Sequence, residues 1–389
     1  MKRTFALMLI SLFFLLPVRN RGQKSEPHAA VEHINGIEYV HNTAIPIRPN
    51  KTLRFVEDLS INEEDKSGNV ILFKPRLAFV DDHEYIYLIE NGDQVIKVFG
   101  PDGKYIRIIG AKGSGPGEFQ TMTYLAITKE GKLVVLDQTT RRTSLFDLSG
   151  RFLKSSQWRS DYFRMIALKN SSYIVSQIIY SPDRQFQQLA VKEVDFDGHE
   201  RLIEGNFTPP EPKIFRQGKY KIYTSPPVST NSLFAGDENR SWFYHCVNNK
   251  YSIDVYDDSG KIFRKIDRPY RPVPFTDKDA QAYRATQANS GNEYIKKAAG
   301  EMEMPKIKSI VERMVVDDEG KLWVQTNENK EEAKRILIAF DVFDSGGQYF
   351  AKIWTDIIPT IFKKGKAYRM VIDHNTGYQS LKRYKVIWE

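Results

Sequence analysis

The stretch Gly110-Ala-Lys-Gly-Ser-Gly-Pro-Gly-Glu-Phe119 lies between two copies of one sequence pattern. Each copy begins with a pair of apolar strands and ends with a short strand, a glycine-containing turn and a further strand. The first copy runs from Arg76 past Gly103, and the second runs from Tyr124 past Gly150. Repeats of this length that contain only short strands are typical of the blades of a β-propeller. The glycine-rich stretch is therefore predicted to link two blades.

The glycine content of this stretch is also a feature of phosphate-binding loops. Such a loop carries Lys-Ser or Lys-Thr after its last glycine, and a helix follows it. Here Glu118 and Phe119 follow Gly117, and the next segment alternates like a strand. We therefore interpret the stretch as a link between blades and not as a nucleotide site.

Turns of the type aromatic-Asp-x-x-Gly mark the hairpins of the blades, because glycine readily adopts the positive φ that such turns need. The candidate turn glycines are Gly103, Gly150, Gly198, Gly260 and Gly346. A sixth blade requires both ends of the chain. Lys366–Ile372 and Ser380–Trp388 supply its inner strands, and either Gly36–His41 or Leu53–Glu57 supplies the outer strand. This closure leaves no open sheet edge, so an all-β, six-bladed β-propeller is predicted over residues 36–389.

Two insertions interrupt the repeat. Residues 206–230 contain five prolines, which cannot donate to a strand ladder, and they are predicted to form a loop over one face. Residues 268–309 are different. Thr276-Asp-Lys-Asp279 resembles a capping box, and the segment to Ala299 is rich in helix-forming residues. One or two helices are therefore predicted before the fifth blade.

The N-terminal residues have the pattern of an export signal. Lys2 and Arg3 precede the apolar run Phe5–Leu16, which is shorter than the roughly 20 residues that a membrane span needs. Residues 1–22 are therefore predicted to be a signal peptide and residues 23–35 a flexible segment. The expected location is periplasmic or secreted; the alternative is a protein anchored in the membrane by residues 5–16.

The composition excludes several classes of protein. A chain of 389 residues with 41% hydrophobic and 12% aromatic residues can form a packed core, so global disorder is excluded. The single cysteine, Cys246, excludes a disulfide framework. The N-terminal segment contributes four of the net +8 charges, and the others are dispersed. Nucleic-acid binding is therefore not expected. The protein is also expected to be a monomer.

From about Ile34 onward, the chain resembles the NHL-type, six-bladed β-propeller proteins that bacteria export. The resemblance is carried by Gly36-Ile-Glu-Tyr-Val-His-Asn42, by Gly113-Ser-Gly-Pro-Gly-Glu-Phe119 and by Asp317-Asp-Glu-Gly-Lys-Leu-Trp-Val324. It implies the fold and fits a helical insertion before the fifth blade. It implies little about function, because propellers serve as binding modules, scaffolds and enzymes alike.

An alignment of the predicted innermost strands suggests one candidate ligand site. It places six residues at equivalent positions at one mouth of the central channel: Arg76, Tyr124, Arg164, Ser232, Arg313 and Arg369. Convergent arginines would bind a carboxylate or phosphate, and the tyrosine could stack or donate a hydrogen bond. The alternative is that each arginine pairs with a nearby acid such as Glu312 or Asp161.

No metal site, catalytic residue or cofactor is predicted. Asp81-Asp82 and Asp317-Asp318 lie at predicted hairpin turns, where Asp side chains bond the turn backbone, and no two of the seven histidines are closely spaced. The favoured function is a non-catalytic binding or interaction module for an anionic small molecule, a glycan or a protein. The alternative is a metal-dependent propeller enzyme, lyase- or lactonase-like, although a ring of arginines would repel a divalent cation on the axis.

Overall fold

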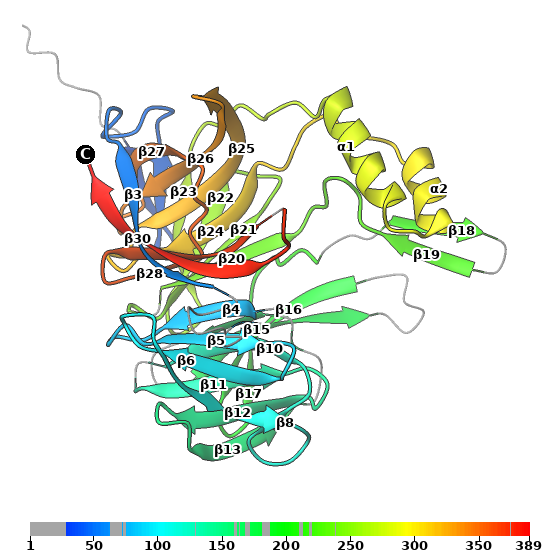
Figure 1. Cartoon of the computed structure of the whole chain (residues 1–389). Helices are drawn as coiled ribbons and strands as arrows, with labels where there is room; N and C mark the ends of the chain where they lie inside the picture. The colour runs from blue at the N-terminus through cyan, green and yellow to red at the C-terminus, as the bar shows by residue number, and fades with distance from the viewer. Residues whose placement is uncertain are drawn as a thin grey trace, which may run out of the picture.

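The computed structural model describes residues 29–389 except 63–71, 73–74, 129, 159–161, 163, 168–171, 181–186, 210–212, 218–219, 238 and 374. The predicted signal peptide, residues 1–22, lies outside the described residues, as does the alternative anchor, 5–16. The described chain forms six blades of antiparallel strands (Figure 1). The first strand of each blade contacts the first strand of the next, and the sixth returns to the first. The prediction of a six-bladed β-propeller is confirmed.

The first half of the ring contains three blades, each described from its innermost strand outward. Blade one contains β4 (Pro75–Val80), β5 (Ile86–Glu90), β6 (Val95–Phe99) and β7 (Tyr105–Ile109). Blade two contains β10 (Met122–Ile127), β11 (Lys132–Asp137), β12 (Arg142–Asp147) and β13 (Phe152–Gln157). Blade three contains β14 (Arg164–Ala167), β15 (Ser172–Tyr180), β16 (Gln187–Asp195) and β17 (Glu200–Ile203).

The second half of the ring follows the same plan. Blade four contains β20 (Ser232–Asp237), β21 (Trp242–Val247), β22 (Ser252–Tyr256) and β23 (Ile262–Asp267). Blade five contains β24 (Val311–Val316), β25 (Leu322–Glu332), β26 (Arg335–Phe343) and β27 (Tyr349–Thr355). Blade six contains β28 (Ile361–Lys363), β29 (Lys366–Ile372), β30 (Gln379–Trp388) and β3 (Leu53–Ile61).

The two ends of the chain close the ring through β3. This strand pairs antiparallel with β30, from Leu53 opposite Trp388 to Ile61 opposite Leu381. Of the two candidate closing strands, Leu53–Glu57 is therefore the one used.

The other candidate, Gly36–His41, belongs to a different blade. Its residues lie in β2 (Ile37–Asn42), which runs parallel to β23 and covers the outer edge of blade four. Strand β1 (Ala29–Ile34) pairs with β2, so this part of the expected flexible segment 23–35 is a strand.

The glycine-rich stretch is an inter-blade link, as predicted. Its ends form the two short strands β8 (Ala111–Lys112) and β9 (Glu118–Phe119), which pair in parallel. The Phe119 ring is fully buried in the core between blades one and two. Gly110 has a φ of 79°, and a Cβ there would lie 2.2 Å from the Phe119 ring. The link therefore needs glycine where its backbone turns against its own aromatic anchor.

We expect Gly110→Ala to destabilise the protein by about 2–4 kcal/mol, since it combines a left-handed backbone penalty with overpacking against Phe119. Gly365→Ala is the matched control. Gly365 also has a positive φ, 68°, but a Cβ added there would have no atom within 4 Å, so only the backbone penalty of about 1–2 kcal/mol applies. Urea unfolding of the two variants measures the difference. Equal losses would contradict the packing argument.

Four of the five predicted turn glycines have the expected positive φ. The glycines with positive φ are Gly103, Gly150, Gly198 and Gly260. In the fifth turn, the prediction of Gly346 is wrong, because Gly347 has the positive φ of 82°. The Asp344 carboxylate accepts bonds from the N–H groups of Gly346 and Gln348, which places the left-handed residue three positions after the aspartate.

The second insertion contains the two predicted helices, α1 (Asp277–Ala288) and α2 (Glu293–Glu301), between β23 and β24. Thr276 caps α1 in the predicted capping box with Asp279. In the described part of the chain, neither these helices nor any other is long and apolar enough to span a membrane.

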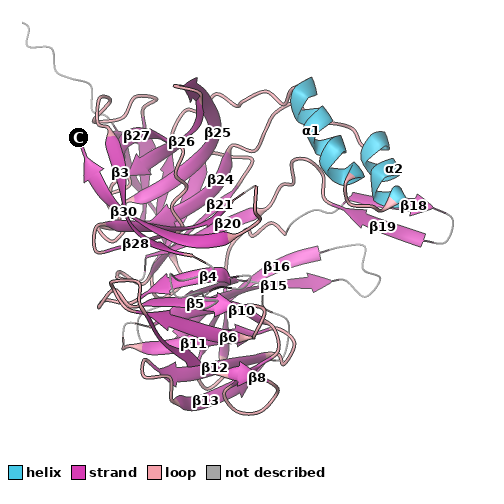
Figure 2. Ribbon diagram, in the orientation of Figure 1, coloured by secondary structure: helices cyan, strands magenta, loops and turns pink. Residues whose placement is uncertain are grey.

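The first insertion differs from its prediction. Within 206–230, β18 (Lys213–Gln217) and β19 (Tyr220–Thr224) form an antiparallel hairpin, so the prediction of a loop is wrong there. The five prolines flank this hairpin, and the residues between them are rich in aromatic and β-branched side chains. Helix α2 packs against β19, and the helices and hairpin together project from the ring (Figure 2).

A buried ion pair joins blades four and five. Asp341 of β26 is fully buried, and one of its carboxylate oxygens lies 2.6 Å from Nη2 of Arg268. The hydroxyl groups of Tyr251 and Tyr349 donate to the same carboxylate at 2.6 and 2.7 Å. The guanidinium also lies over both tyrosine rings, 4.8 and 4.7 Å from their centroids. This cluster fastens the loop after β23 to the core of blade five.

Candidate ligand sites

The structure places two of the predicted site residues at matching positions. Tyr124 of β10 and Arg313 of β24 each follow a bulge, opposite Leu136 and Gln325 of the second strands. Tyr124 is half-buried against the core between blades two and three, whereas Arg313 is exposed. Arg76 and Arg164 lie on the innermost strands β4 and β14, but their side chains are outside the described part of the structure.

Ser232 is buried and hydrogen-bonded within the protein interior. It is 5% exposed, and its Oγ accepts the N–H of Thr208 at 2.8 Å and lies 2.8 Å from His245 Nε2. His245 Nδ1 is in turn 3.8 Å from an Asp254 oxygen, the order found in hydrolytic triads. The rings of Phe207 and His245 form a T-shaped pair with 4.9 Å between their centroids. We therefore interpret the Ser232 hydroxyl as a structural group that holds the segment leading into blade four.

Arg369 is not on an innermost strand, and this part of the alignment is wrong. The three-residue strand β28 lies inside β29, which carries Arg369 and is the second strand of blade six. A tight turn at Lys364 and Gly365, both with positive φ, separates the two strands. Arg369 therefore lies outside the innermost strands, which carry the other five predicted residues.

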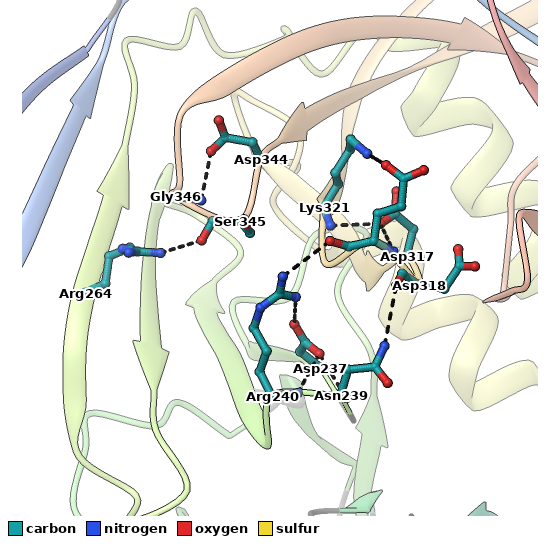
Figure 3. Close-up of polar contacts among 11 residues, drawn as sticks. Asp237, Asn239, Arg240, Arg264, Asp317, Asp318, Lys321, Asp344, Ser345 and Gly346 are labelled. Atoms are coloured by element: carbon teal, nitrogen blue, oxygen red, sulfur yellow. Dashed lines mark hydrogen bonds and ion pairs between the residues drawn. The ribbon is translucent and has the colours of Figure 1, made fainter. Parts of the chain in front are cut away.

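Several arginines of this chain bond from one blade to the next, and we call them latch arginines. Arg264 of β23 donates to the carbonyl oxygen of Ser345 at 2.7 Å, in the turn between β26 and β27 (Figure 3). Nearby, Arg240 bonds Asp237 at 2.7 Å (Figure 3). Arg240 also bonds the carbonyl oxygen of Glu319 at 3.4 Å. Such guanidinium groups are satisfied by the fold. Equivalent latches join Arg201 to Ser259 (2.6 Å) and Arg383 to Pro101 (2.7 Å).

Arg369 belongs instead to a cavity of about 490 Å³ between blades five and six, which we call the basic pocket. It is built by β3, β26, β27, β29 and β30, and thus by both ends of the chain. Its lining consists of Leu53, Arg54, Phe55, Glu57, Arg335, Leu337, Trp354, Thr355, Asp356, Ile357, Arg369, Val371, Lys382 and Tyr384.

Four cationic and two anionic side chains line the basic pocket. Lys382 pairs with Glu57 at 2.9 Å, and Arg54 pairs at 3.0 Å with Glu389, which is outside the lining. Arg335 reaches Asp356 only at 3.5 Å, and this pair is largely exposed to water. The pairs are therefore weak, and positive charge remains in excess.

Arg369 has the least compensation of the four. Its Nη1 donates to the backbone carbonyl of Asp356 at 3.0 Å, and within the described residues no carboxylate lies at ion-pair distance from it. It also sits directly opposite Lys382 in the ladder of β29 and β30. Like charges in directly opposed positions destabilise a sheet. An anion bound between them would remove that repulsion.

Aromatic side chains form the other walls of the pocket. Lys330 and Lys352 lie over the Trp354 ring, 5.2 and 5.6 Å from its centroid, and each is paired with a glutamate. Burial, with a smaller contribution from the Glu57 carboxylate, raises the pKa of Tyr384. Its hydroxyl therefore stays protonated at neutral pH and can donate a hydrogen bond.

Of the cations in this pocket, Arg369 was predicted from the sequence as a site residue, but Arg54, Arg335 and Lys382 were not. Arg335 follows a run of mixed charges at a hairpin end, which gives no indication of a cavity. Arg54 and Lys382 come together only because β3 pairs with β30. Had Leu53–Glu57 been taken as the closing strand, the sequence would have placed Arg54 near Lys382.

The predicted turn aspartates are structural. Asp81 accepts the N–H groups of His83 and Tyr85, both at 2.9 Å, and Asp317 accepts the indole N–H of Trp323 at 2.9 Å. Over the described ranges, no three His, Cys, Asp or Glu side chains are grouped as metal ligands. Cys246 is buried, and this burial raises the pKa of its thiol to about 12.

Comparisons with known proteins agree with the fold. Residues 71–208 match the model of the DUF5128 family, described as a six-bladed β-propeller. No curated protein matches the chain. The structure is similar to that of a DUF4221 family member from Bacteroides vulgatus, with 11% identity, a TM-score of 0.51 and coverage of 86% of this chain and 98% of that one.

Two further solved structures are similar over most of their length. One is a protein from Bacteroides fragilis described as exported, with 12% identity, a TM-score of 0.48 and coverage of 90% of this chain and 99% of that one. The other is a gluconolactonase from Xanthomonas campestris, with 11% identity, a TM-score of 0.43 and coverage of 84% and 89%. At these identities, the likeness concerns the fold alone.

Proposed function

We propose that this chain is a non-catalytic binding module whose basic pocket recognises a ligand bearing a carboxylate or phosphate group. The observation that carries the proposal is Arg369, a partly exposed residue that lies opposite Lys382 and lacks a described carboxylate partner. Guanidinium groups bind carboxylates and phosphates through two parallel hydrogen bonds. The latch arginines Arg201, Arg240, Arg264 and Arg383, by contrast, each pair with a carboxylate of the protein.

The size and walls of the basic pocket suit a small organic anion. Its volume of about 490 Å³ lies within the range of roughly 300–1,000 Å³ that is usual for small-molecule sites. Phe55, Trp354 and Tyr384 offer apolar surface for the body of the ligand. A sugar acid or an organic phosphate has both parts, and an acidic peptide segment of a protein partner has the same chemistry.

The place where the protein works remains a prediction from the sequence. The resemblance to exported, NHL-type propellers and the signal-like residues 1–22 favour a periplasmic or secreted binding module. A ligand taken up outside the cytoplasm is consistent with a pocket that opens on the surface of the ring.

Isothermal titration in low-salt buffer with galacturonate, citrate and inorganic phosphate tests the proposal. We expect at least one of these anions to bind, with an affinity that falls as salt is added. Arg369→Ala should weaken binding by about 10- to 100-fold, the value of a charged hydrogen bond of roughly 1.5–3 kcal/mol. The affinity of Arg369→Lys should lie between those of the unmodified chain and Arg369→Ala, because lysine keeps the charge but cannot form two parallel hydrogen bonds.

Arg284→Ala is the matched control. Arg284 is an exposed arginine of α1 that does not line the basic pocket, so its loss changes the net charge alone. Binding should be unchanged in this variant. The proposal fails if none of the three anions binds, or if Arg369→Ala and Arg284→Ala bind equally well.

A further inference from the structure

A second cavity, of about 480 Å³, lies where both insertions meet the ring. We call it the insertion pocket, and it shares no residue with the basic pocket. It lies among α1, the segment that follows β19, and the ends of blade strands. Its lining consists of Pro226, Pro227, Val228, Ser229, Asn231, Asn248, Phe275, Asp279, Ala282, Tyr283, Lys308, Ser309, Glu312 and Asn327.

The walls of the insertion pocket are held in place. The two ends of the helical insertion pair through a bridge between Pro274 and Ile307. The Tyr283 hydroxyl of α1 donates to the carbonyl oxygen of Ser225 at 2.8 Å and so ties the helix to the first insertion. Adjacent prolines restrict that segment further. The pocket is therefore largely formed before any ligand arrives, which lowers the entropic cost of binding.

Three asparagines from two blades form the polar floor. Asn248 is buried; its side chain donates to the Ser229 carbonyl at 2.8 Å and accepts the N–H of Asn231 at 3.0 Å. Asn327 donates to the Ser309 carbonyl at 2.8 Å. These two amides are fixed by the fold, and they position the backbone around the third.

Asn231 differs from the other two asparagines. Its Oδ1 is buried and has no hydrogen-bond partner in the described structure. A buried polar atom without a partner is costly, and native proteins rarely leave one unsatisfied. Asn231 lines the insertion pocket, so a rotation of its side chain toward the pocket would bring this oxygen within reach of a donor on a bound ligand.

The charges of the insertion pocket disfavour an anion. Asp279 is paired with Lys308 at 2.7 Å, and Glu312 accepts a bond from the Asn327 amide. This pocket therefore lacks the excess of cations that marks the basic pocket. Amide and carboxylate groups offer donors and acceptors side by side, which matches hydroxyl groups, since each hydroxyl both donates and accepts.

We propose that the insertion pocket binds a neutral, polyhydroxylated ligand, specifically a short neutral glycan. The asparagines and Glu312 would bond its hydroxyl groups, and Phe275 and Tyr283 offer ring surface for the apolar face of a sugar. The cavity volume lies in the range of roughly 300–1,000 Å³ that small-ligand sites occupy. This site goes beyond the anion-binding function, and each can stand without the other.

Saturation-transfer NMR of the full chain with maltose, cellobiose, lactose and chitobiose tests the proposal. We expect transfer to at least one disaccharide. Asn231→Ala should weaken its binding by roughly 3- to 10-fold, the value of one neutral hydrogen bond. Asn231→Asp keeps an acceptor at that place and should retain binding. The Asn231 side chain makes no described hydrogen bond, so both variants are expected to fold, and a thermal melt verifies this.

Asn329→Ala is the matched control, since Asn329 is an exposed asparagine on the same strand as Asn327 and does not line the pocket. Its binding should equal that of the unmodified chain. Absence of transfer to all four disaccharides would overturn the proposal, as would equal binding by Asn231→Ala and Asn329→Ala. Binding abolished by Arg369→Ala but not by Asn231→Ala would also overturn it, because that pattern belongs to the basic pocket.

Discussion

A chain that begins at Asn62, and so lacks β3, is expected not to fold. Strand β3 supplies the outer strand of blade six through a ladder from Leu53 to Ile61. Ile61 is 3% exposed and packs in the core between blades six and one, together with Tyr368 and Leu381. Its loss opens that core and exposes the edge of β30. Because domains are stable by only about 5–15 kcal/mol, removal of a whole strand should exceed the available stability.

A chain that begins at Asn42 is the matched control. It loses β1 and almost all of β2, which cover the outer edge of blade four and include the buried Val40, and it keeps β3. Asn42 itself is retained, since its amide accepts the N–H of Tyr349 at 2.7 Å. Circular dichroism should show cooperative thermal melting for this chain and none for the chain from Asn62. Equal melting curves would contradict a closure made by β3.

The sequence was sufficient for the parts of the fold that have local signatures. The link at Gly110–Phe119 and the capping box at Thr276 were predicted because each depends on neighbouring residues. Strand β28 was missed because three residues cannot show an alternating pattern. This omission moved Arg369 from the second strand of blade six to the innermost position in the alignment.

The candidate sites could be predicted only in part, because each is assembled from distant segments. In the basic pocket, Arg54 and Lys382 are more than 300 residues apart and meet through the pairing of β3 with β30. The insertion pocket depends on where α1 comes to rest, a matter of tertiary packing rather than of helix propensity. Arginine content was also misleading, since the fold uses residues such as Arg264 and Arg201 to latch blades.

Replacement of Arg268 by methionine is expected to destabilise the ring by about 3–5 kcal/mol, the typical cost of removing one partner from a buried ion pair. Asp341 is fully buried, so after the change its carboxylate would keep only the two tyrosine hydroxyls and the more distant Lys352 at 3.8 Å. Burial, together with the Asp341 charge, holds the pKa of Tyr251 well above its usual value. Tyr251 therefore remains a donor and cannot supply the missing positive charge.

The matched control for Arg268→Met is Arg151→Ala. Arg151 pairs with Asp147 at 3.0 Å, but its side chain is 76% exposed, so its loss should cost no more than about 1 kcal/mol. A second variant, Asp341→Asn, tests the same pair from the other side. It keeps an acceptor for the tyrosines but leaves the buried guanidinium without a negative charge, so its free energy of unfolding should also fall by several kcal/mol. Urea unfolding gives the three values. If Arg268→Met and Arg151→Ala unfold at the same midpoint, the contact between blades four and five is held by apolar packing, and the ion pair contributes nothing to it.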